Sequence, residues 1–306
     1  MPWHDEGRAA AARHGYGGPM ASQSDDHVSV NVRFWDALAD AHGRGSDAYY
    51  DVEALVAGRS SLSDVEETAV RESVGDVNGL DVLHVQCHLG MDAVSMARRG
   101  ARVTGIDFSP VALRRAADIA AACGVQVDYV EADSTALPPS LQARFDLAYA
   151  TIGVLCWIAD LDAWMRSVRS TLRPGGRLVV VDLHPMLVMV ESTEPLRFDM
   201  PYAFDGSHEF VEPESYAGVG TAGDGRNVNY AHSLGEVVSA AVRAGLRLEA
   251  LVEHLDAPFD PRGDVLARED DGRFRLRVTG QPLPVLFTLL ASYPGELLRP
   301  ADPRHG

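Results

Sequence analysis

Apolar and polar residues follow two alternating rhythms along most of the chain. From residue 62 onward, short apolar runs that suit buried strands are separated by stretches whose apolar residues recur at helical spacing. This pattern predicts strands over residues 81–86, 101–107, 126–131, 145–149, 177–183, 247–254 and 283–291. Strands that alternate with helices indicate an α/β fold with a doubly wound, mostly parallel sheet and helices on both faces.

Helix starts are marked by residues that satisfy unpaired backbone N–H groups. Capping boxes begin at Ser63 and at Ser233, each with a glutamate three positions later, and Ser109 precedes a proline. Asp160 precedes a run whose apolar residues share one helical face. We therefore expect helices over 64–73, 91–99, 110–122, 161–172 and 234–244.

The rhythm fails in two places. Residues 184–229 contain several glycines and aromatic residues without periodicity, so we interpret them as an insertion after the fifth strand. Residues 256–282 are rich in proline, glycine and charge and are expected to form a loop. The two strands that flank this loop are consecutive, which favours one antiparallel member in the sheet.

The ends of the chain differ from this central region. The expected layout is a flexible arm (1–27), an N-terminal helical segment (28–61), a main domain (62–291, with the insertion 184–229) and a tail (292–306). The aromatic-rich segment 28–61 fits either a helix packed on the core or a lid over a ligand. Met20 offers a second start for translation beside Met1.

Composition and charge narrow the class of function. The 306 residues carry a formal charge of −17, which disfavours nucleic acid and anionic membranes as partners. All 27 basic residues are arginine, so no lysine is present to form a Schiff base. Three cysteines without a CxxC pair and the lack of a long apolar run favour a cytoplasmic protein. Whether it forms a homodimer stays open.

Candidate ligand-binding residues fall where strands end. The first strand leads into the turn Gln86-Cys87-His88-Leu89-Gly90, which keeps a single glycine. Asp107 ends the second strand, 21 positions after Gln86, where a carboxylate can accept hydrogen bonds from ribose hydroxyls. Asp133 follows the third strand and could meet an adenine amino group. Together the two aspartates favour an adenosine ligand.

These segments resemble a known family as a set. LHVQCHLGMDAVSMARRGARVTGIDFSP, VEADSTALP, FDLAYATIGVLCW, LRPGG and VVDLHP are similar to class I S-adenosylmethionine-dependent methyltransferases, in particular to a subgroup with a Q-C-H-x-G turn. The resemblance covers about residues 30–290. It implies a seven-stranded sheet whose last strand is antiparallel, S-adenosylmethionine as the cofactor, and methylation of a small molecule.

The resemblance also implies roles for individual residues. The methionine part of the cofactor would lie at Gly90 and the backbone of Gln86, Cys87 and His88. The remaining implied contacts are with the ribose, the base and the sulfonium, through Asp107, Phe108, Asp133, Ser134 and Thr151. His84, Gln86 and His88 replace an acidic residue and two glycines of the family pattern.

Residues for the methyl acceptor are expected near the ends of the fourth and fifth strands. Histidines titrate near neutrality, and His184 ends the fifth strand, so His184 is the leading candidate for a general base and His232 is the second, each with a purely structural role as the alternative. The expected acceptor walls are Trp35, Trp157, Glu191 and Tyr230. Asp182 and His184 lack a third ligand at fixed spacing, so no metal is expected.

The favoured hypothesis is transfer of a methyl group from S-adenosylmethionine to an O, N or C nucleophile of a small, partly apolar molecule. The altered first turn motivates an alternative, a protein that binds S-adenosylmethionine without transferring its methyl group. A nicotinamide dehydrogenase shares the aspartate after the second strand but normally needs the glycines that are absent here.

Overall fold

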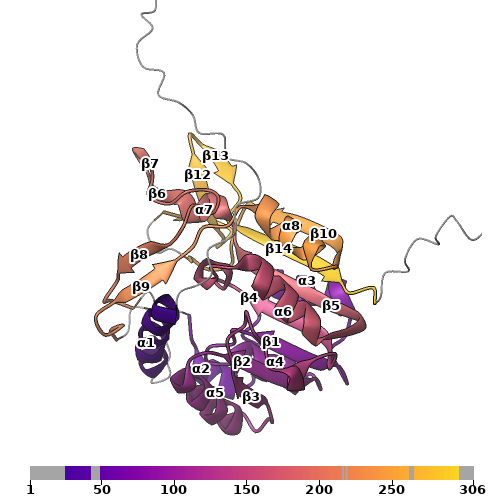
Figure 1. Cartoon of the computed structure of the whole chain (residues 1–306). Coiled ribbons are helices and arrows are strands. Elements are labelled where there is room, and N and C mark those ends of the chain that lie inside the picture. The colour runs from indigo at the N-terminus through magenta and orange to yellow at the C-terminus, as the bar shows by residue number, and fades with distance from the viewer. Residues whose placement is uncertain (1–24, 43–48, 216, 218–219, 262–264, 296–306) are drawn as a thin grey trace, which may run out of the picture.

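A seven-stranded sheet forms the centre of the molecule in the computed structural model, which describes residues 25–42, 49–215, 217, 220–261 and 265–295 (Figure 1). The strand order is β3-β2-β1-β4-β5-β14-β10. β14 is antiparallel to both of its neighbours, and the other pairings are parallel. The strands are β1 (Asp81–Val85), β2 (Arg102–Asp107), β3 (Asp128–Glu131), β4 (Phe145–Thr151), β5 (Leu172–Leu183), β10 (Arg247–His254) and β14 (Leu286–Ser292). This confirms the predicted fold class.

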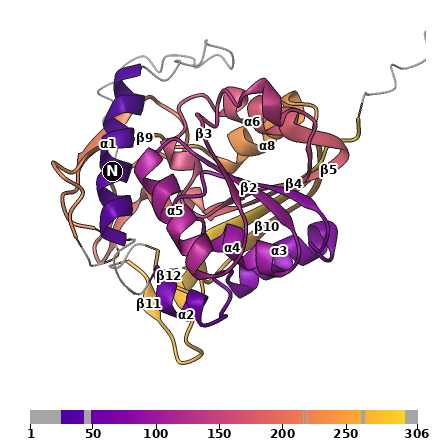
Figure 2. The same cartoon turned by 90° about the horizontal axis from the view of Figure 1, so that it is seen from below.

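Helices cover both faces of the sheet because alternate strand residues point to opposite sides. On one face, Leu83 and Val180 pack with the apolar stripes of α6 (Leu161–Thr171) and α8 (Leu234–Arg243). On the other face, Val82 and Val181 pack with α3 (Asp64–Val74) and α4 (Met91–Arg98). Figure 2 shows these two helices on that side of the sheet. α5 (Pro110–Ala122) packs beside α4.

The predicted helix starts are confirmed. Ser63 and Ser233 form complete capping boxes with Glu66 and Glu236. The side chains of Ser109 and Asp160 accept hydrogen bonds from the first turns of α5 and α6. Two 3₁₀ turns, η1 (Pro139–Leu141) and η2 (Leu155–Trp157), flank β4.

The N-terminal segment forms α1 (Asp25–His42) and α2 (Val52–Val56). α1 lies against α5 and β9 at the carboxyl ends of β1 to β3 (Figure 2). The expected boundary at residue 27 falls inside α1, because the helix already begins at Asp25. Most of the expected arm and tail, residues 1–24 and 296–306, lies outside the described residues.

The insertion after β5 consists of short elements. They are α7 (Pro185–Met189), the hairpin of β6 (Val190–Thr193) and β7 (Leu196–Phe198), and the hairpin of β8 (His208–Val211) and β9 (Arg226–Asn229).

The expectation of a plain loop over residues 256–282 was wrong. This region holds β11 (Ala267–Arg268), β12 (Phe274–Val278) and β13 (Gln281–Leu283), which form a three-stranded sheet. Three arginines at alternate positions pair with acidic residues, including Arg273 with Asp256 and Arg277 with Glu269. Composition suggested a loop, whereas cross-strand charge pairing stabilises short strands.

Candidate functional site

The turn between β1 and α4 has three residues in the left-handed conformation that glycine favours, although only one of them is a glycine. Gln86, His88 and Gly90 have φ angles of 55°, 46° and 65°. In this left-handed region a residue with a Cβ atom is destabilised by roughly 1–2 kcal/mol. Other contacts must therefore hold Gln86 and His88 in place, and such strain is concentrated at functional sites.

The Gln86 side chain supplies part of that support. Its Nε2 donates to the carbonyl oxygen of Val154 at 3.1 Å. Its Oε1 accepts from Trp164 Nε1 at 2.8 Å and from Ser134 Oγ at 3.4 Å. The amide thus joins the carboxyl end of β1 to the segments that follow β3 and β4.

Asp107 supports the turn from the neighbouring strand. Its carboxylate accepts from the backbone N–H groups of His88 and Ser109, both at 2.9 Å. Burial raises the pKa of Asp107 to about 6, while these hydrogen bonds act in the opposite direction. Each carboxylate oxygen can accept more than one hydrogen bond, so Asp107 retains capacity for a ligand hydroxyl.

Gly90 is required for packing as well as for its φ angle. A Cβ atom on Gly90 would lie 2.6 Å from the hydroxyl oxygen of Tyr129, which is far inside contact distance. One on Gly105 would lie 2.9 Å from Cys87 Sγ. The two glycines let the aromatic ring of Tyr129 and the Cys87 thiol fill the space beneath the turn.

Four of the predicted cofactor residues line one cavity, here named the α1 cavity. It has a volume of about 340 Å³, part of it open to solvent. Gln86, Phe108, Asp133 and Ser134 come from the ends of β1, β2 and β3. The other walls are Trp157 and Ile158, and Val28 and Asn31 of α1.

Helix α1 is joined to the first turn by side-chain contacts. Asp36 Oδ1 accepts from Ser109 Oγ at 2.5 Å and from the Val111 backbone N–H at 3.4 Å. His42 Nδ1 lies 3.1 Å from His88 Nε2. Neither α1 residue was among the predicted site residues, because contacts over 46 and 73 positions leave no local sequence pattern.

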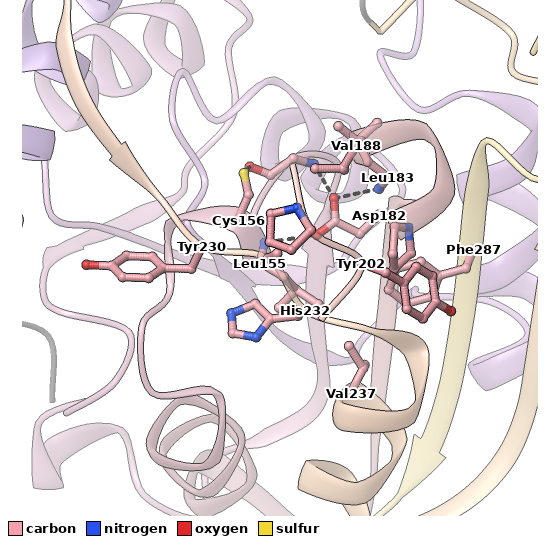
Figure 3. A pocket seen from close by; sticks show the side chains of 14 residues that line it. Leu155, Cys156, Asp182, Leu183, Val188, Tyr202, Tyr230, His232, Val237 and Phe287 are labelled. Carbon is pink, nitrogen blue, oxygen red and sulfur yellow. Dashed lines mark hydrogen bonds between the residues drawn. The ribbon is translucent and has the colours of Figure 1, made fainter. Parts of the chain in front are cut away.

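A second cavity, here named the β5 cavity, lies at the carboxyl ends of β4 and β5 (Figure 3). Its volume is about 440 Å³, part of it open to solvent. Most of its wall is apolar or aromatic and includes Leu155, Leu183, Pro185, Val188, Tyr202, Val237 and Phe287. The residues with titratable side chains in the wall are Cys156, Asp182, Tyr202, Tyr230 and His232. Segment 155–158 contributes to both cavities and therefore separates them.

Asp182 shapes that separating segment. Its carboxylate accepts from the backbone N–H groups of Gly153 and of Leu155, the latter at 2.9 Å. It also accepts from its neighbour Leu183 at 2.7 Å. Burial raises the pKa of Asp182, and these hydrogen bonds oppose that rise. The carboxylate thus holds the chain after β4 against the end of β5.

His232 has the geometry of a neutral base. Its Nε2 lies 2.6 Å from the carbonyl oxygen of Ile158, which can only accept, so Nε2 carries the proton. Nδ1 then keeps its lone pair, and no hydrogen-bond partner for it is found among the described residues. Burial lowers the pKa of His232. The ring packs in parallel on Phe204 at a centroid distance of 5.9 Å, which fixes its orientation.

His184, the other predicted base, is placed differently. Nδ1 accepts from the Met186 backbone N–H at 3.0 Å, so the imidazole is the N-cap of α7. Nε2 lies 2.9 Å from Glu253 Oε1. The side chain is 2% exposed, and His184 is not part of the β5 cavity wall. Both ring nitrogens of His184 are thus engaged by partners within the protein.

Some of the remaining predicted site residues lie at or near a cavity, and others do not. Tyr230 lines the β5 cavity, and Trp35 packs edge-on against Trp157 at a centroid distance of 5.1 Å. Thr151 donates its hydroxyl proton to Glu66 of α3. Glu191 is exposed on β6 and lines neither cavity. Cys87 is buried beneath the turn, and burial raises the pKa of its thiol.

The described residues contain neither a metal-binding cluster nor a membrane-spanning helix. No three histidine, cysteine, aspartate or glutamate side chains there are grouped closely enough to hold a metal ion. In the same part of the chain, no helix has both the length and the apolar character needed to cross a membrane.

The fold matches known structures of one class of enzyme. An S-adenosylmethionine-dependent methyltransferase from Clostridium acetobutylicum superposes with a TM-score of 0.51 and 12% identity, covering 75% of this chain and 90% of that one. One from Methanosarcina mazei has a TM-score of 0.51 and 15% identity, with 76% and 97% covered. The sheet order with its antiparallel β14 is thus the class I methyltransferase fold.

Sequence comparison supports the same assignment. Residues 82–176 match the family model described as a methyltransferase domain. A ubiquinone biosynthesis O-methyltransferase from Ralstonia nicotianae is 31% identical over 151 residues, which are 48% of this chain and 63% of that protein. One from Alkalilimnicola ehrlichii is 34% identical over 148 residues, or 47% and 60%. Both matches span less than two thirds of the relative. Residues 82–176 are thus similar to methyltransferase domains, and the fold is that of the class I S-adenosylmethionine-dependent methyltransferases.

Proposed function

We propose that this protein transfers the methyl group of S-adenosylmethionine to a hydroxyl oxygen of a small, partly apolar molecule, with His232 as the general base. The observation that carries this proposal is the position of His232 in the wall of an apolar cavity, with its Nε2 held 2.6 Å from the Ile158 carbonyl oxygen. That cavity is separated by a single chain segment from the cavity with the predicted nucleoside contacts.

The α1 cavity suits the nucleoside part of the cofactor. Asp133 and Ser134 would bind the edge of the adenine, and Phe108 would pack beside it. Asp107 is buried and does not line the cavity, but it precedes Phe108 and would accept hydrogen bonds from the ribose hydroxyls. The methionine part follows the turn from Gln86 to Gly90, towards the start of α4. In this pose Trp35 and Trp157 offer aromatic faces to the positively charged sulfonium.

The chemistry is an in-line displacement at the methyl carbon. Bound S-adenosylmethionine would supply the activated methyl group: the acceptor oxygen would form the new O–CH₃ bond as the C–S bond breaks, and the electron pair would stay on sulfur in S-adenosylhomocysteine. The hydroxyl proton moves to His232 Nδ1, and the Ile158 carbonyl stabilises the imidazolium through Nε2–H. The apolar walls exclude water that would compete for the methyl group.

A hydroxyl acceptor is favoured because a neutral imidazole can take a proton from it during attack. The relatives named above are O-methyltransferases. Aromatic walls such as Tyr202 and Phe287 suit a ring-bearing acceptor such as a phenol.

We further propose a cytoplasmic protein whose main domain spans residues 62–291. On this proposal neither nucleic acid nor membrane is a partner, and homodimerisation remains a question for solution measurements.

A methyl-transfer assay tests the proposal. The protein is incubated with S-adenosylmethionine labelled in the methyl group and a panel of alkyl-substituted phenols and catechols, with matched anilines and thiophenols as controls. We expect label in the methyl ether of at least one phenol, with one equivalent of S-adenosylhomocysteine released. Binding of S-adenosylhomocysteine without transfer to any acceptor would favour the alternative function, a protein that binds the cofactor without using its methyl group.

A further inference from the structure

Asn31 of α1 makes an unusual contact for a residue on a surface helix. Its side chain is 2% exposed. Nδ2 donates to the carbonyl oxygen of Val228 at 2.9 Å, and Oδ1 accepts from the Val228 backbone N–H at 2.8 Å. A side-chain amide can donate and accept in this way, so Asn31 takes the place of a neighbouring strand along β9.

Val228 begins a segment that leads directly to the proposed base. Two residues later the Tyr230 backbone N–H donates to the carbonyl oxygen of Cys156 at 2.7 Å. His232 follows and donates to the carbonyl oxygen of Ile158. Segment 228–232 is thus attached at four points. Two are to α1, through Asn31 and through His27, whose Nδ1 lies 2.9 Å from the Tyr230 hydroxyl oxygen, and two are to the segment that separates the two cavities.

The same helix borders the α1 cavity. Asn31 and Val28 form one wall of it, and Ile158 forms part of another. A nucleoside in this cavity would therefore contact both the helix that holds Val228 and the residue whose carbonyl orients His232. A ligand in the α1 cavity and the base in the β5 cavity therefore both contact α1-linked residues and Ile158, so binding in one cavity can affect the position of the base in the other.

We propose that Asn31 is a positioning residue for methyl transfer, which couples cofactor binding in the α1 cavity to the placement of His232 in the β5 cavity. This inference rests on the proposed function. In this arrangement a bound cofactor fixes α1, α1 fixes Val228 through the amide pair, and the ordered segment holds Nδ1 of His232 towards the acceptor.

Hydrogen–deuterium exchange measures this coupling without a known acceptor. The probe is S-adenosylhomocysteine, and the readout is the exchange rate of backbone amides in peptides covering 226–232, with mass-spectrometric detection. In the wild-type protein we expect saturating S-adenosylhomocysteine to slow this exchange by about tenfold or more, because opening of the segment becomes rarer. In Asn31→Ala we expect the cofactor-dependent slowing to disappear.

Affinity separates coupling from a loss of binding. Because coupling between two sites is reciprocal, the Kd of Asn31→Ala for S-adenosylhomocysteine should rise by no more than about the same tenfold factor. Asn31→Asp keeps an acceptor for the Val228 N–H and should retain partial slowing, which also provides a second variant if the alanine protein does not fold. Asn229→Ala removes a hydrogen bond to Asn227 within β9 and should leave the coupling intact.

The change in kcat relative to KM gives a further readout, which a purely structural role of Asn31 would leave unchanged. With a phenol from the assay above, Asn31→Ala should lower kcat by about tenfold while the KM for S-adenosylmethionine changes less. Equal cofactor-dependent slowing in Asn31→Ala and Asn229→Ala would overturn the inference. So would wild-type protein that binds S-adenosylhomocysteine and transfers methyl groups without any change in 226–232. Failure of the wild-type protein to bind S-adenosylhomocysteine would instead overturn the proposed function.

Discussion

The two cavities are built in different ways. The strand-end walls of the α1 cavity come from turns that follow consecutive strands, so Gln86, Phe108 and Asp133 occupy fixed places in a repeating strand-and-helix pattern. The β5 cavity combines the end of β5 with an insertion, α8 and β14. On the proposed function, cofactor binding would depend on the regular part of the fold, whereas the irregular part would select the acceptor.

The largest expected effect separates two histidines of the β5 side. His232→Ala removes the free Nδ1 and should lower kcat by roughly 10²–10⁴-fold, the usual contribution of a general base. Its affinity for S-adenosylhomocysteine should change little. His184→Ala removes the N-cap of α7 and should mainly lower stability, by about 0.5–2 kcal/mol. Steady-state kinetics and thermal denaturation distinguish the variants. A larger loss of kcat in His184→Ala would reverse the assignment.

Asp107 tests the α1 cavity. Asp107→Asn removes the negative charge that accepts from the ribose and from two backbone N–H groups, so cofactor binding should weaken by roughly 1–3 kcal/mol. Titration calorimetry with S-adenosylhomocysteine measures this loss. Asp128→Asn, an equal charge change at an exposed position on β3, is the matched control and should bind normally. Normal binding by Asp107→Asn would remove this residue from the cofactor site.

Gly90 tests how tightly the first turn is packed. Gly90→Ala adds a Cβ atom against the Tyr129 hydroxyl at a φ of 65° and should lower the free energy of unfolding by about 1–3 kcal/mol. Gly124→Ala has a similar φ of 68° with nothing within 4 Å, so it measures the backbone strain alone. Denaturant unfolding gives both values. Equal losses would mean that contact with Tyr129 is unimportant.

The pH dependence separates the two cavities by their own titrating groups. Only neutral His232 accepts a proton, and burial lowers its pKa, so kcat should stay level down to about pH 6.5, the ordinary imidazole value, and fall only below it. Asp107 binds the ribose best when ionised, and its pKa is about 6, so kcat/KM for the cofactor should also fall below about pH 6. An acid limb of kcat above pH 6.5 would contradict the role of His232.

Local patterns were sufficient to predict most of the fold. Caps such as Ser63 and Ser109 and the buried strands follow from nearest neighbours in the sequence, and the structure has them where they were expected. The same locality explains the error over residues 256–282. There the ion pair of Arg273 with Asp64 joins positions 209 residues apart, beyond the reach of any local pattern.

The acceptor side depended on long-range partners. The sequence favoured His184 over His232 as the base, but Glu253 engages His184 from 69 positions away, and Ile158 orients His232 from 74 positions away. Thr151 sits at the end of β4 as expected, yet its hydroxyl donates to Glu66 of α3. Asn31 reaches Val228 over 197 positions. Each of these roles depends on a contact between residues far apart in the sequence, and local patterns do not predict such contacts.

A crystal structure with bound S-adenosylhomocysteine tests the central claim most directly. We expect the ribose at Asp107, the adenine between Phe108 and Asp133, and the sulfur facing the cavity that holds His232 Nδ1. A nucleoside bound elsewhere, or a sulfur atom turned away from the β5 cavity, would contradict the account.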